Sequence, residues 1–536
     1  MNCDVEPCAA RAELPRGRIG VHASLLLVAL AAASGGCGQR PAGPSSQEAP
    51  AASAEAVARA SEVAQPAGWD EGLTIAPARD LNPDPHVLEV EFEAKPVELE
   101  ILPGKKTTVW TYNGQLPGPL LRAQLGDRVI VHFKNSLPVE TTIHWHGLRV
   151  PNEMDGAPGV TQPPIAPGAE FRYEFVLKDA GTYWYHPHVD SAVQVGRGLY
   201  GPIVVVDPSD PRAFGDDLVL MLSDMSLDEE GQPLPDDNGG QFGNLFGREG
   251  STLLVNGRVV PHLKVRTGKQ QRWRIVNAAR ARYFNLRLPG HRFVRLGGDN
   301  GLAARSEDVY NVVVAPGERA DAVFTPADPP GSRKVLQWVP FDRGYGSTFN
   351  RPREDLLAID TVDAPAVTPE PIPAELRAIA PIDVAGATER SLAFTIALNG
   401  RDVVMGFNGV PYEHAKAIEA RLGETDVWKI VNDTDFAHPF HLHGYFFQVL
   451  DDSRVPEWKD TISVPSKSEL KIAVRFDERP GMWMYHCHIL DHAEAGMMGH
   501  LHVVDASSFA TRAAPTARHA HAPVHGDDVA TANPGQ

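Results

Sequence analysis

One unit recurs three times along this chain of 536 residues, and the repeat constrains the fold more than any other feature. Each copy, about 150 residues long, opens with an Asn-Gly turn and continues into an alternating apolar and polar run that ends in another Asn. The turns are Asn113-Gly114, Asn256-Gly257 and Asn408-Gly409, and the runs end at Asn135, Asn277 and Asn432. Alternation with period two is typical of a half-buried strand, and Asn-Gly is typical of a tight turn between strands.

A second turn signal follows later in each copy, at Pro167-Gly168, Pro316-Gly317 and Pro465-Ser466, and precedes another alternating run. Many short strands between turns that contain Gly and Pro predict an all-β chain of three β-sandwiches in series. The copies place these domains at residues 81–207, 208–365 and 366–505. Residues 506–536 are rich in Ala, Pro and His and are expected to form a disordered tail.

The N-terminal residues have the pattern of an export signal. Arginines precede the apolar residues 25–33, and small residues follow directly before Cys37. This pattern predicts a secretion signal over residues 1–37, because the apolar core is too short to span a bilayer. Cys37 also matches the cysteine of a bacterial lipoprotein cleavage box, so we expect membrane attachment through a lipid there, with plain cleavage as the alternative. Residues 38–80 are then a flexible linker, and the protein is exported to the periplasm or cell envelope.

Charge and cysteine content limit the possible functions. The formal net charge of −18 argues against a nucleic-acid partner, because a phosphate-binding surface needs a basic patch. Of the four cysteines, Cys3, Cys8 and Cys37 belong to the leader, so the rest of the chain holds only Cys487. A disulfide within the body is therefore impossible, and a single thiol in an oxidising compartment is expected to bind a metal.

Histidines occur repeatedly in His-x-His pairs. Four pairs fall at matching places in the first and third copies: His144-Trp145-His146, His186-Pro187-His188, His441-Leu442-His443 and His486-Cys487-His488. The second copy has no pair at either place, so we expect one site between the first and third copies, with the second as a spacer. Residues i and i+2 of a strand share a face, so eight imidazoles can surround three metal ions. Neutral imidazole suits copper, whereas structural zinc closes with four ligands.

The segment around Cys487 contains a second type of metal site. Cys487, His492 and Met497 match three ligands of a blue-copper centre, which needs two His, one Cys and a weak axial Met. On a strand, the neighbouring His486 and His488 would point to the opposite face, one residue from the thiolate. Such a connection suits electron transfer between two metal sites. The alternative is a buried free cysteine among hydrogen-bonded core histidines.

Taken together, these motifs resemble the three-domain multicopper oxidases, which include bacterial laccases, spore-coat laccases, bilirubin oxidases and periplasmic cuprous oxidases. The resemblance covers about residues 80–505 and implies three consecutive cupredoxin-like Greek-key β-sandwich domains with four copper ions, one type 1, one type 2 and two type 3. It implies type 1 ligands His438, Cys487, His492 and Met497, type 2 ligands His144 and His441, and type 3 ligands His146, His186, His188, His443, His486 and His488. A further pair, His500 and His502, receives no role.

The same resemblance implies that O2 is reduced to water while a small reductant is oxidised at the type 1 copper. We expect phenols or aromatic amines as reductants, as in laccases, since the nine methionines form no cluster over the site and no lid is evident. The first alternative is a cuprous oxidase for periplasmic copper tolerance, in which Asp435 would ligate incoming Cu(I). The second is a copper-binding protein without turnover.

Two acids match places where family members deliver protons to the cluster. Asp155 follows the first His pair, and its alternative role is simply to form the turn before Gly156. A second family acid usually follows the type 1 His directly. Here that position is Ala493, and Glu494 stands one residue later. Asp155 and Glu494 are therefore the expected catalytic acids.

Overall fold

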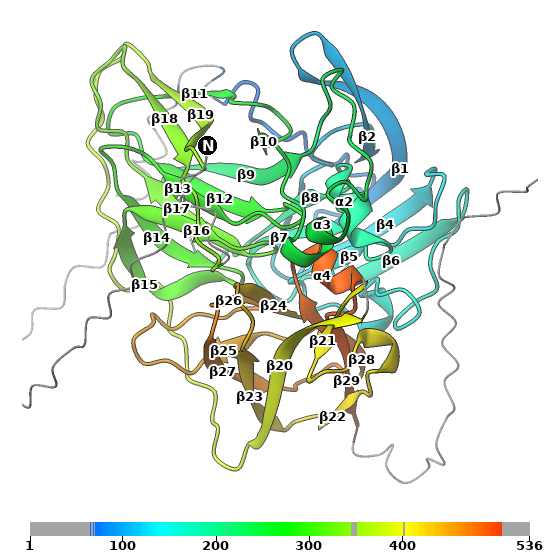
Figure 1. The fold of residues 1–536 in the computed structure, drawn as a ribbon. Helices are drawn as coiled ribbons and strands as arrows, with labels where there is room; N and C mark the ends of the chain where they lie inside the picture. The colour runs from blue at the N-terminus through cyan, green and yellow to red at the C-terminus, as the bar shows by residue number, and fades with distance from the viewer. Residues whose placement is uncertain are drawn as a thin grey trace, which may run out of the picture. The chain divides into compact units, whose positions relative to one another are not determined.

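Six β-sheets, arranged as three pairs, make up the computed structural model (Figure 1). It describes residues 65, 68, 70–210, 212–344, 351–399 and 402–505. The expected secretion signal, Cys37, most of the linker and the C-terminal tail lie outside these residues. No helix among the described residues is long and apolar enough to cross a membrane.

The first sandwich consists of the sheets β2-β1-β4-β6 and β3-β8-β7-β5. Its strands are β1 (Val87–Leu102), β2 (Lys105–Tyr112), β3 (Leu121–Gln124), β4 (Arg128–Asn135), β5 (His144–His146), β6 (Glu170–Val176), β7 (Gly181–His186) and β8 (Gly201–Val206). It also carries the 3-10 helix η1 (Asn152–Met154) and helix α2 (Ser191–Gly196).

The second sandwich consists of the sheets β10-β9-β12-β17-β14-β15 and β11-β19-β18-β13-β16. Its elements are β9 (Asp216–Met225), α3 (Gly240–Phe246), β10 (Thr252–Val255), β11 (His262–Val265), β12 (Gln271–Asn277), β13 (Phe284–Arg287), β14 (Phe293–Gly298), β15 (Gly301–Val309), β16 (Asn311–Val314), β17 (Arg319–Phe324), β18 (Arg333–Trp338) and β19 (Glu354–Thr361).

The third sandwich consists of the sheets β21-β20-β23-β27-β25 and β22-β29-β28-β24-β26. Its elements are β20 (Thr388–Asn399), β21 (Asp402–Phe407), η3 (Tyr412–His414), β22 (Ile418–Arg421), β23 (Thr425–Asn432), β24 (His438–Leu442), β25 (Phe447–Val449), β26 (Thr461–Val464), β27 (Ser468–Arg475), β28 (Gly481–Cys487), α4 (Leu490–Glu494) and β29 (Met498–Val504).

The three sandwiches share one topology. In each, the opening strand pairs in parallel with a later strand, β1 with β4, β9 with β12 and β20 with β23. A second parallel pair recurs in the other sheet, β3 with β8, β11 with β19 and β22 with β29. These crossovers confirm the predicted all-β fold of three consecutive cupredoxin-like Greek-key sandwiches. The residue boundaries proposed for the domains stay a prediction.

The Asn-Gly signals form the same turn three times. Asn113, Asn256 and Asn408 have positive φ angles of 55°, 51° and 54°, a conformation that Asn tolerates better than most residues. Each side chain also bonds to the opening strand of its sandwich: Asn113, for example, accepts from the Glu93 backbone N–H at 2.7 Å and donates to the Glu91 carbonyl at 2.7 Å. The repeated asparagine is therefore a structural feature of the sandwich.

The asparagines that end β4 and β23 shape the loops that lead to the histidines. The Asn432 amide donates to the carbonyls of Phe436 and Val464, and its oxygen accepts from the Thr434 N–H. Asn135 makes the matching bonds in the first sandwich. Because both residues are fully buried, these bonds fix the loops that run into β5 and β24.

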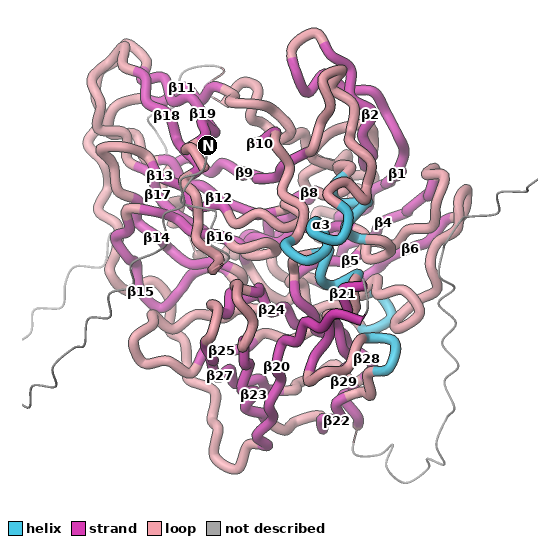
Figure 2. Tube along the Cα trace, in the orientation of Figure 1, coloured by secondary structure: helices cyan, strands magenta, loops and turns pink. Residues whose placement is uncertain are grey.

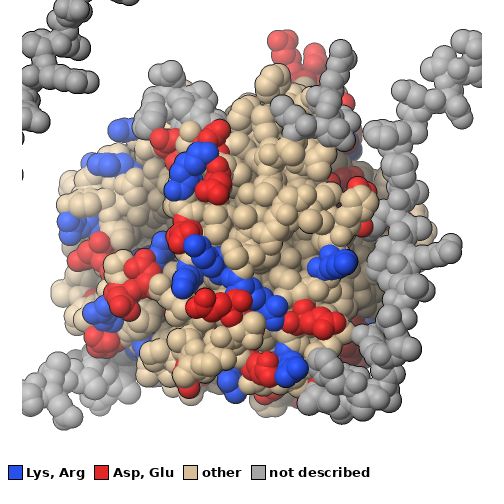
Figure 3. All heavy atoms as spheres, turned by 60° about the horizontal axis from the view of Figure 1, so that its bottom comes forward, with Lys and Arg blue, Asp and Glu red and all other residues tan. Residues whose placement is uncertain are grey.

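Each sandwich encloses its own apolar core, with the fully buried Trp145, Trp273 and Trp428 among its members. Helices are few and short (Figure 2), and both α2 and α3 pack against α4. On the face shown in Figure 3, Lys and Arg side chains lie interspersed with Asp and Glu side chains. The net negative charge therefore does not form one continuous acidic field on that face.

Candidate metal centres

The four His-x-His pairs lie on paired strands of the first and third sandwiches or within two residues of their ends. In the first, β5 pairs antiparallel with β7, so that His144 stands opposite His186. In the third, β24 pairs antiparallel with β28, so that His441 stands opposite His486. All eight imidazoles of the four pairs are buried. The structure therefore brings these histidines together between the two sandwiches.

The eight rings form three overlapping groups whose ligand atoms lie within 4.8 Å of one another. The groups are His146, His186 and His488; His188, His443 and His486; and His144, His146 and His441. Each group combines residues of the first and third sandwiches. The Nε2 atoms of His188 and His486, for instance, lie 3.4 Å apart. Such a set of converging nitrogen donors is what a cluster of closely spaced copper ions requires.

Hydrogen bonds show which ring nitrogen is free for a metal. The Nδ1 atoms of His144, His186 and His441 donate to backbone carbonyls at 2.8 to 3.0 Å. A carbonyl only accepts, so Nδ1 carries the proton and Nε2 keeps its lone pair. Within the described part of the chain, these three buried Nε2 atoms have no hydrogen-bond partner. Buried lone pairs without a partner are costly, and a bound metal ion would satisfy them.

Burial also keeps the rings neutral, as metal ligation requires. It lowers the pKa of His186, His486 and His488 well below the usual range, and neighbouring imidazoles lower the pKa further. The donor set, its protonation and its unsatisfied nitrogens all fit copper ions at this position.

A second centre lies at the end of β28. The Cys487 sulfur lies 3.5 Å from Nδ1 of His438 and 3.6 Å from Nδ1 of His492, and the two nitrogens are 3.1 Å apart. The Met497 carbonyl accepts the Cys487 backbone N–H at 3.0 Å, and both side chains are fully buried in one apolar core. Burial raises the pKa of the Cys487 thiol, so a metal that binds the thiolate there would displace the proton.

Alternation along β28 separates the two centres. Cys487 faces His438 and His492, whereas His486 belongs to the group with His188 and His443. His486 Nδ1 also donates to the Cys487 carbonyl oxygen at 2.9 Å. The two centres are thus joined through one residue, both by covalent bonds and by a hydrogen bond.

The expectation that the second sandwich is only a spacer is wrong. The Leu245 carbonyl at the end of α3 accepts a hydrogen bond from His492 Nε2 at 3.1 Å. Arg280 and Arg248 of the same sandwich bind the Asp491 carboxylate next to His492. No lid was evident in the sequence, yet α3 lies over the outer edge of His492 in the structure.

Asp155 lies directly after η1 and contacts two of the rings. Its carboxylate oxygen Oδ2 accepts from His443 Nδ1 at 2.9 Å, and its carbonyl accepts from His144 Nδ1 at 2.8 Å. Burial alone would raise the pKa of this carboxyl group, but the imidazoles of His443 and His144 outweigh burial and lower it. Asp155 thus reaches the histidine cluster, where sequence reasoning expected it.

Glu494 ends α4, and its Oε1 accepts the backbone N–H of Ser191, the first residue of α2, at 2.7 Å. The side chain reaches solvent, while burial of the carboxyl end and the nearby Asp190 raise its pKa. His500 of β29 contacts the tilted ring of Tyr412 in η3, with ring centroids 4.7 Å apart. His500 and His502 belong to none of the groups that could hold a metal among the described residues.

Asp435 pairs through its side chain with a surface lysine and not with a candidate metal ligand. Its side chain is 82% exposed and pairs with Lys467 at 2.8 Å. The preceding residue, Thr434, instead places its hydroxyl 2.9 Å from Nε2 of His438. Sequence reasoning missed Thr434, although its position two residues after the loop-forming Asn432 was a usable signal.

Comparisons with known proteins agree with this geometry. Three family models described as multicopper oxidase match residues 93–210, 216–334 and 385–507. The multicopper oxidase MmcO of Mycobacterium tuberculosis is 30% identical over 437 residues, which cover 74% of this chain and 83% of the relative. A laccase of Bacillus subtilis is 27% identical, over 74% of this chain and 91% of the relative. A solved multicopper oxidase from Campylobacter jejuni, described as a metallo-oxidase, aligns with a TM-score of 0.72 and 30% identity, over 80% of this chain and 94% of that one.

Proposed function

This chain belongs to the multicopper oxidase family, and on that premise we propose that it is a laccase-like enzyme for small aromatic reductants. It is a copper-dependent oxidoreductase with O2 as acceptor. In the proposed reaction, phenols or aromatic amines lose one electron at a time near His492, and O2 is reduced to water between the first and third sandwiches.

The proposed ligands follow the two centres. One type 1 copper would be held by His438, Cys487, His492 and Met497, one type 2 copper by His144 and His441, and two type 3 coppers by His146, His186, His188, His443, His486 and His488. When bound, these four ions accept single electrons from the reductant and supply the four-electron reduction of O2 to water. The protein keeps the rings neutral, orients them through their outer nitrogens and excludes bulk water from both centres.

The choice of an organic reductant rests on a row of aromatic rings from the surface to the type 1 ligands. Phe242 of α3 is 73% exposed and stacks on Phe246, with centroids 6.4 Å apart. Phe246 contacts Phe436 at 5.9 Å, and Phe436 contacts the rings of both His438 and His492, at 5.1 and 5.7 Å. An aromatic reductant stacked on Phe242 would thus be connected to the ligand rings through Phe246 and Phe436.

Oxidation of Cu(I) is the second candidate, because the solved Campylobacter jejuni relative is described as a metallo-oxidase. The hydrogen-bond partners of the outer nitrogens of His438 and His492 favour Cu(I) as a reductant less than an organic molecule. Their partners are the Thr434 hydroxyl and the Leu245 carbonyl, whereas soft Cu(I) prefers thioether and thiolate ligands. The exposed Asp435 carboxylate pairs with Lys467, which does not support a role for it in binding Cu(I).

Asp155 and Glu494 remain the proposed acids near the cluster. Asp155 accepts hydrogen bonds from a ring nitrogen of His443 and one of His144, so its first proposed role is to orient these two rings. The Glu494 carboxylate at the end of α4 binds the backbone of Ser191, which starts α2 and lies three residues after His188. Proton delivery by either residue stays a prediction.

Export stays a proposal that rests on the N-terminal sequence. It predicts that the mature protein starts near Cys37 and, if lipidated, partitions into detergent. Mass spectrometry of the N-terminal peptide from the native host tests this. An intact residue 1 would contradict it.

O2 uptake by the copper-loaded protein tests the function, with a methoxyphenol in one cell and Cu(I) in the other. We expect about four coppers per chain and faster uptake with the phenol. Cys487→Ser is the control, since it removes the thiolate and should abolish the blue colour and both activities. Faster uptake with Cu(I) would make the protein a cuprous oxidase. No uptake from fully loaded protein would leave only copper binding.

A further inference from the structure

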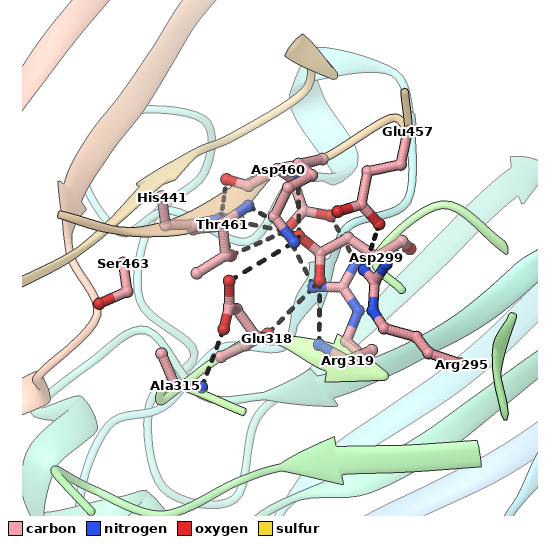
Figure 4. A network of polar contacts seen from close by, with 12 residues as sticks. Arg295, Asp299, Ala315, Glu318, Arg319, His441, Glu457, Asp460, Thr461 and Ser463 are labelled. Atoms are coloured by element: carbon pink, nitrogen blue, oxygen red, sulfur yellow. Dashed lines mark hydrogen bonds and ion pairs between the residues drawn. The ribbon is translucent and has the colours of Figure 1, made fainter. Parts of the chain in front are cut away.

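Arg319, the first residue of β17 in the second sandwich, binds a carboxylate that contacts two of the proposed ligands, although that sandwich supplies none of the proposed ligands. Its side chain is fully buried. Nη1 donates to Oδ1 of Asp460 at 2.8 Å, and Nη2 donates to Oδ2 of the same carboxylate, which makes a two-point ion pair (Figure 4). Asp460 directly precedes β26 in the third sandwich.

The guanidinium group is held without freedom to turn. Its remaining hydrogens donate to three backbone carbonyls: Nε to Thr182 at 3.1 Å, Nη1 to Gly317 at 3.0 Å and Nη2 to Asp299 at 2.9 Å. Arginine has five N–H donors, and all five are used. One of these carbonyls belongs to the first sandwich and two belong to the second. Arg319 therefore joins all three sandwiches at one point.

The backbone of Asp460 is fixed from the same side. The Asp299 carboxylate accepts the N–H of Asp460 at 3.3 Å and that of Thr461 at 3.1 Å. Lys459 adds an ion pair to the same carboxylate at 3.2 Å. The second sandwich thus sets the position of both the side chain and the carbonyl of Asp460.

Asp460 in turn contacts two proposed copper ligands. Its carbonyl accepts from His441 Nδ1 at 3.0 Å, and its Oδ1 lies 3.2 Å from His146 Nε2. The two rings stack, with centroids 3.9 Å apart and planes 10° apart. Thr461 donates its hydroxyl to Oδ1 at 2.8 Å, so the hydroxyl oxygen can only accept from the rings.

These contacts determine the tautomers. A carboxylate and a carbonyl only accept, so the proton lies on Nε2 of His146 but on Nδ1 of His441. The atoms left free are Nδ1 of His146 and Nε2 of His441, and both are buried without a hydrogen-bond partner among the described residues. One residue therefore selects opposite nitrogens on two adjacent rings.

We propose that Arg319 is a positioning residue for the copper cluster: by fixing the Asp460 carboxylate it selects the nitrogens of His146 and His441 that face copper. The inference rests on the assignment of these two histidines as ligands. It gives the second sandwich a function in O2 reduction, although the sandwich has no ligand of its own.

An ion pair that merely holds two sandwiches together would have a different signature. Arg295 and Glu457 form such a pair between the same two sandwiches, and neither contacts a histidine of the cluster. Arg295→Met is therefore the matched control for Arg319→Met. Arg319→Lys is the milder variant, because it keeps the charge but loses the two-point geometry.

The test uses the full chain loaded with copper. We measure copper per chain after dialysis against a chelator, the type 1 and type 2 electron paramagnetic resonance signals, O2 uptake, and thermal unfolding of the copper-free protein. In Arg319→Lys we expect about 10- to 100-fold weaker retention of type 2 copper and a similar fall in O2 uptake, with an unchanged type 1 signal. Arg295→Met should lower the unfolding temperature but leave both signals and the copper content unchanged.

A double-variant comparison separates position from stability. If Arg319 acts through Asp460, adding Arg319→Met to Asp460→Asn should cost little further type 2 copper. Full type 2 signal and copper content in folded Arg319→Lys would overturn the inference, and so would equal losses in Arg295→Met. Unaltered protein that lacks a type 2 signal would instead refute the proposed function itself.

Discussion

Replacing Asp155 by Asn should slow O2 reduction while leaving the type 1 centre intact. The carboxylate accepts the His443 Nδ1 hydrogen at 2.9 Å and is almost fully buried. The His144 Nδ1 hydrogen is bound by the backbone carbonyl of residue 155, which the substitution keeps. Asn therefore preserves one acceptor for each ring and removes only the negative charge.

The size of the effect follows from that change. A hydrogen bond to a charged group contributes about 1.5–3 kcal/mol, and a neutral one about 0.5–1.5 kcal/mol. Losing the charge thus weakens the hold on His443 by about 1–2 kcal/mol, which corresponds to about 5- to 30-fold. If the rate-limiting step depends on this hydrogen bond to His443, O2 uptake falls by the same factor.

The assay compares two steps in the same preparation. Steady-state O2 uptake reports the whole cycle, and anaerobic bleaching of the blue colour by the reductant reports the type 1 centre alone. We expect slower uptake and unchanged bleaching, because the side-chain and backbone bonds of Asp155 go to His443 and His144 and not to the proposed type 1 ligands. Unchanged uptake in a variant with full copper would refute the reasoning. Slower bleaching would show that the substitution acts through the fold.

Three further predictions concern the ring of Phe242, the carboxylate of Asp435 and the pH dependence of stability. Phe242→Ala should raise KM for a methoxyphenol about two- to tenfold, since an aromatic stack contributes about 0.5–1.5 kcal/mol, while Cu(I)-driven O2 uptake stays constant; equal effects on both would remove the stacking site. Asp435→Ala should alter neither activity, because its carboxylate is exposed and pairs with Lys467, and a selective loss of Cu(I) oxidation would contradict this. The free energy of unfolding of the copper-free protein, measured in urea, should fall as the pH is lowered from about 6.5, the usual histidine pKa, towards the pKa of about 3 that burial gives His188 and His492. The reason is that the unfolded chain binds protons that the folded chain excludes. A free energy of unfolding that stays constant over that range would contradict the conclusion that the rings are buried and neutral.

Much of the fold could be read from local patterns. Asn113, Asn256 and Asn408 occupy the same left-handed turn and bond to the opening strand of each sandwich, so their spacing reported the repeat directly. The two-residue period of a strand likewise placed Cys487 and His486 on opposite faces of β28. These features could be predicted because turn conformation and strand alternation depend on residues close in sequence.

The partners of the metal ligands were harder to predict. Sequence reasoning chose Asp435 beside His438, but a difference of one residue in a loop reverses which side chain faces inward, and the bonds of Asn432 bring Thr434 there instead. The second sandwich was taken for a spacer because it lacks histidine pairs. Its contributions come from a backbone carbonyl and from arginines, which carry no recognisable motif.

The sequence by itself determined the candidate ligand side chains, the three sandwiches and the grouping of these side chains into two candidate centres, because ligand chemistry and strand periodicity are local properties. Only the tertiary structure decided which nitrogen of each imidazole is free, what covers His492, and how Arg319 acts on Asp460. The cover of His492, the action of Arg319 and the proton on His146 Nε2 depend on hydrogen bonds between residues more than a hundred positions apart. Such bonds form only after the three sandwiches have packed together, and no spacing of residues in the sequence predicts them.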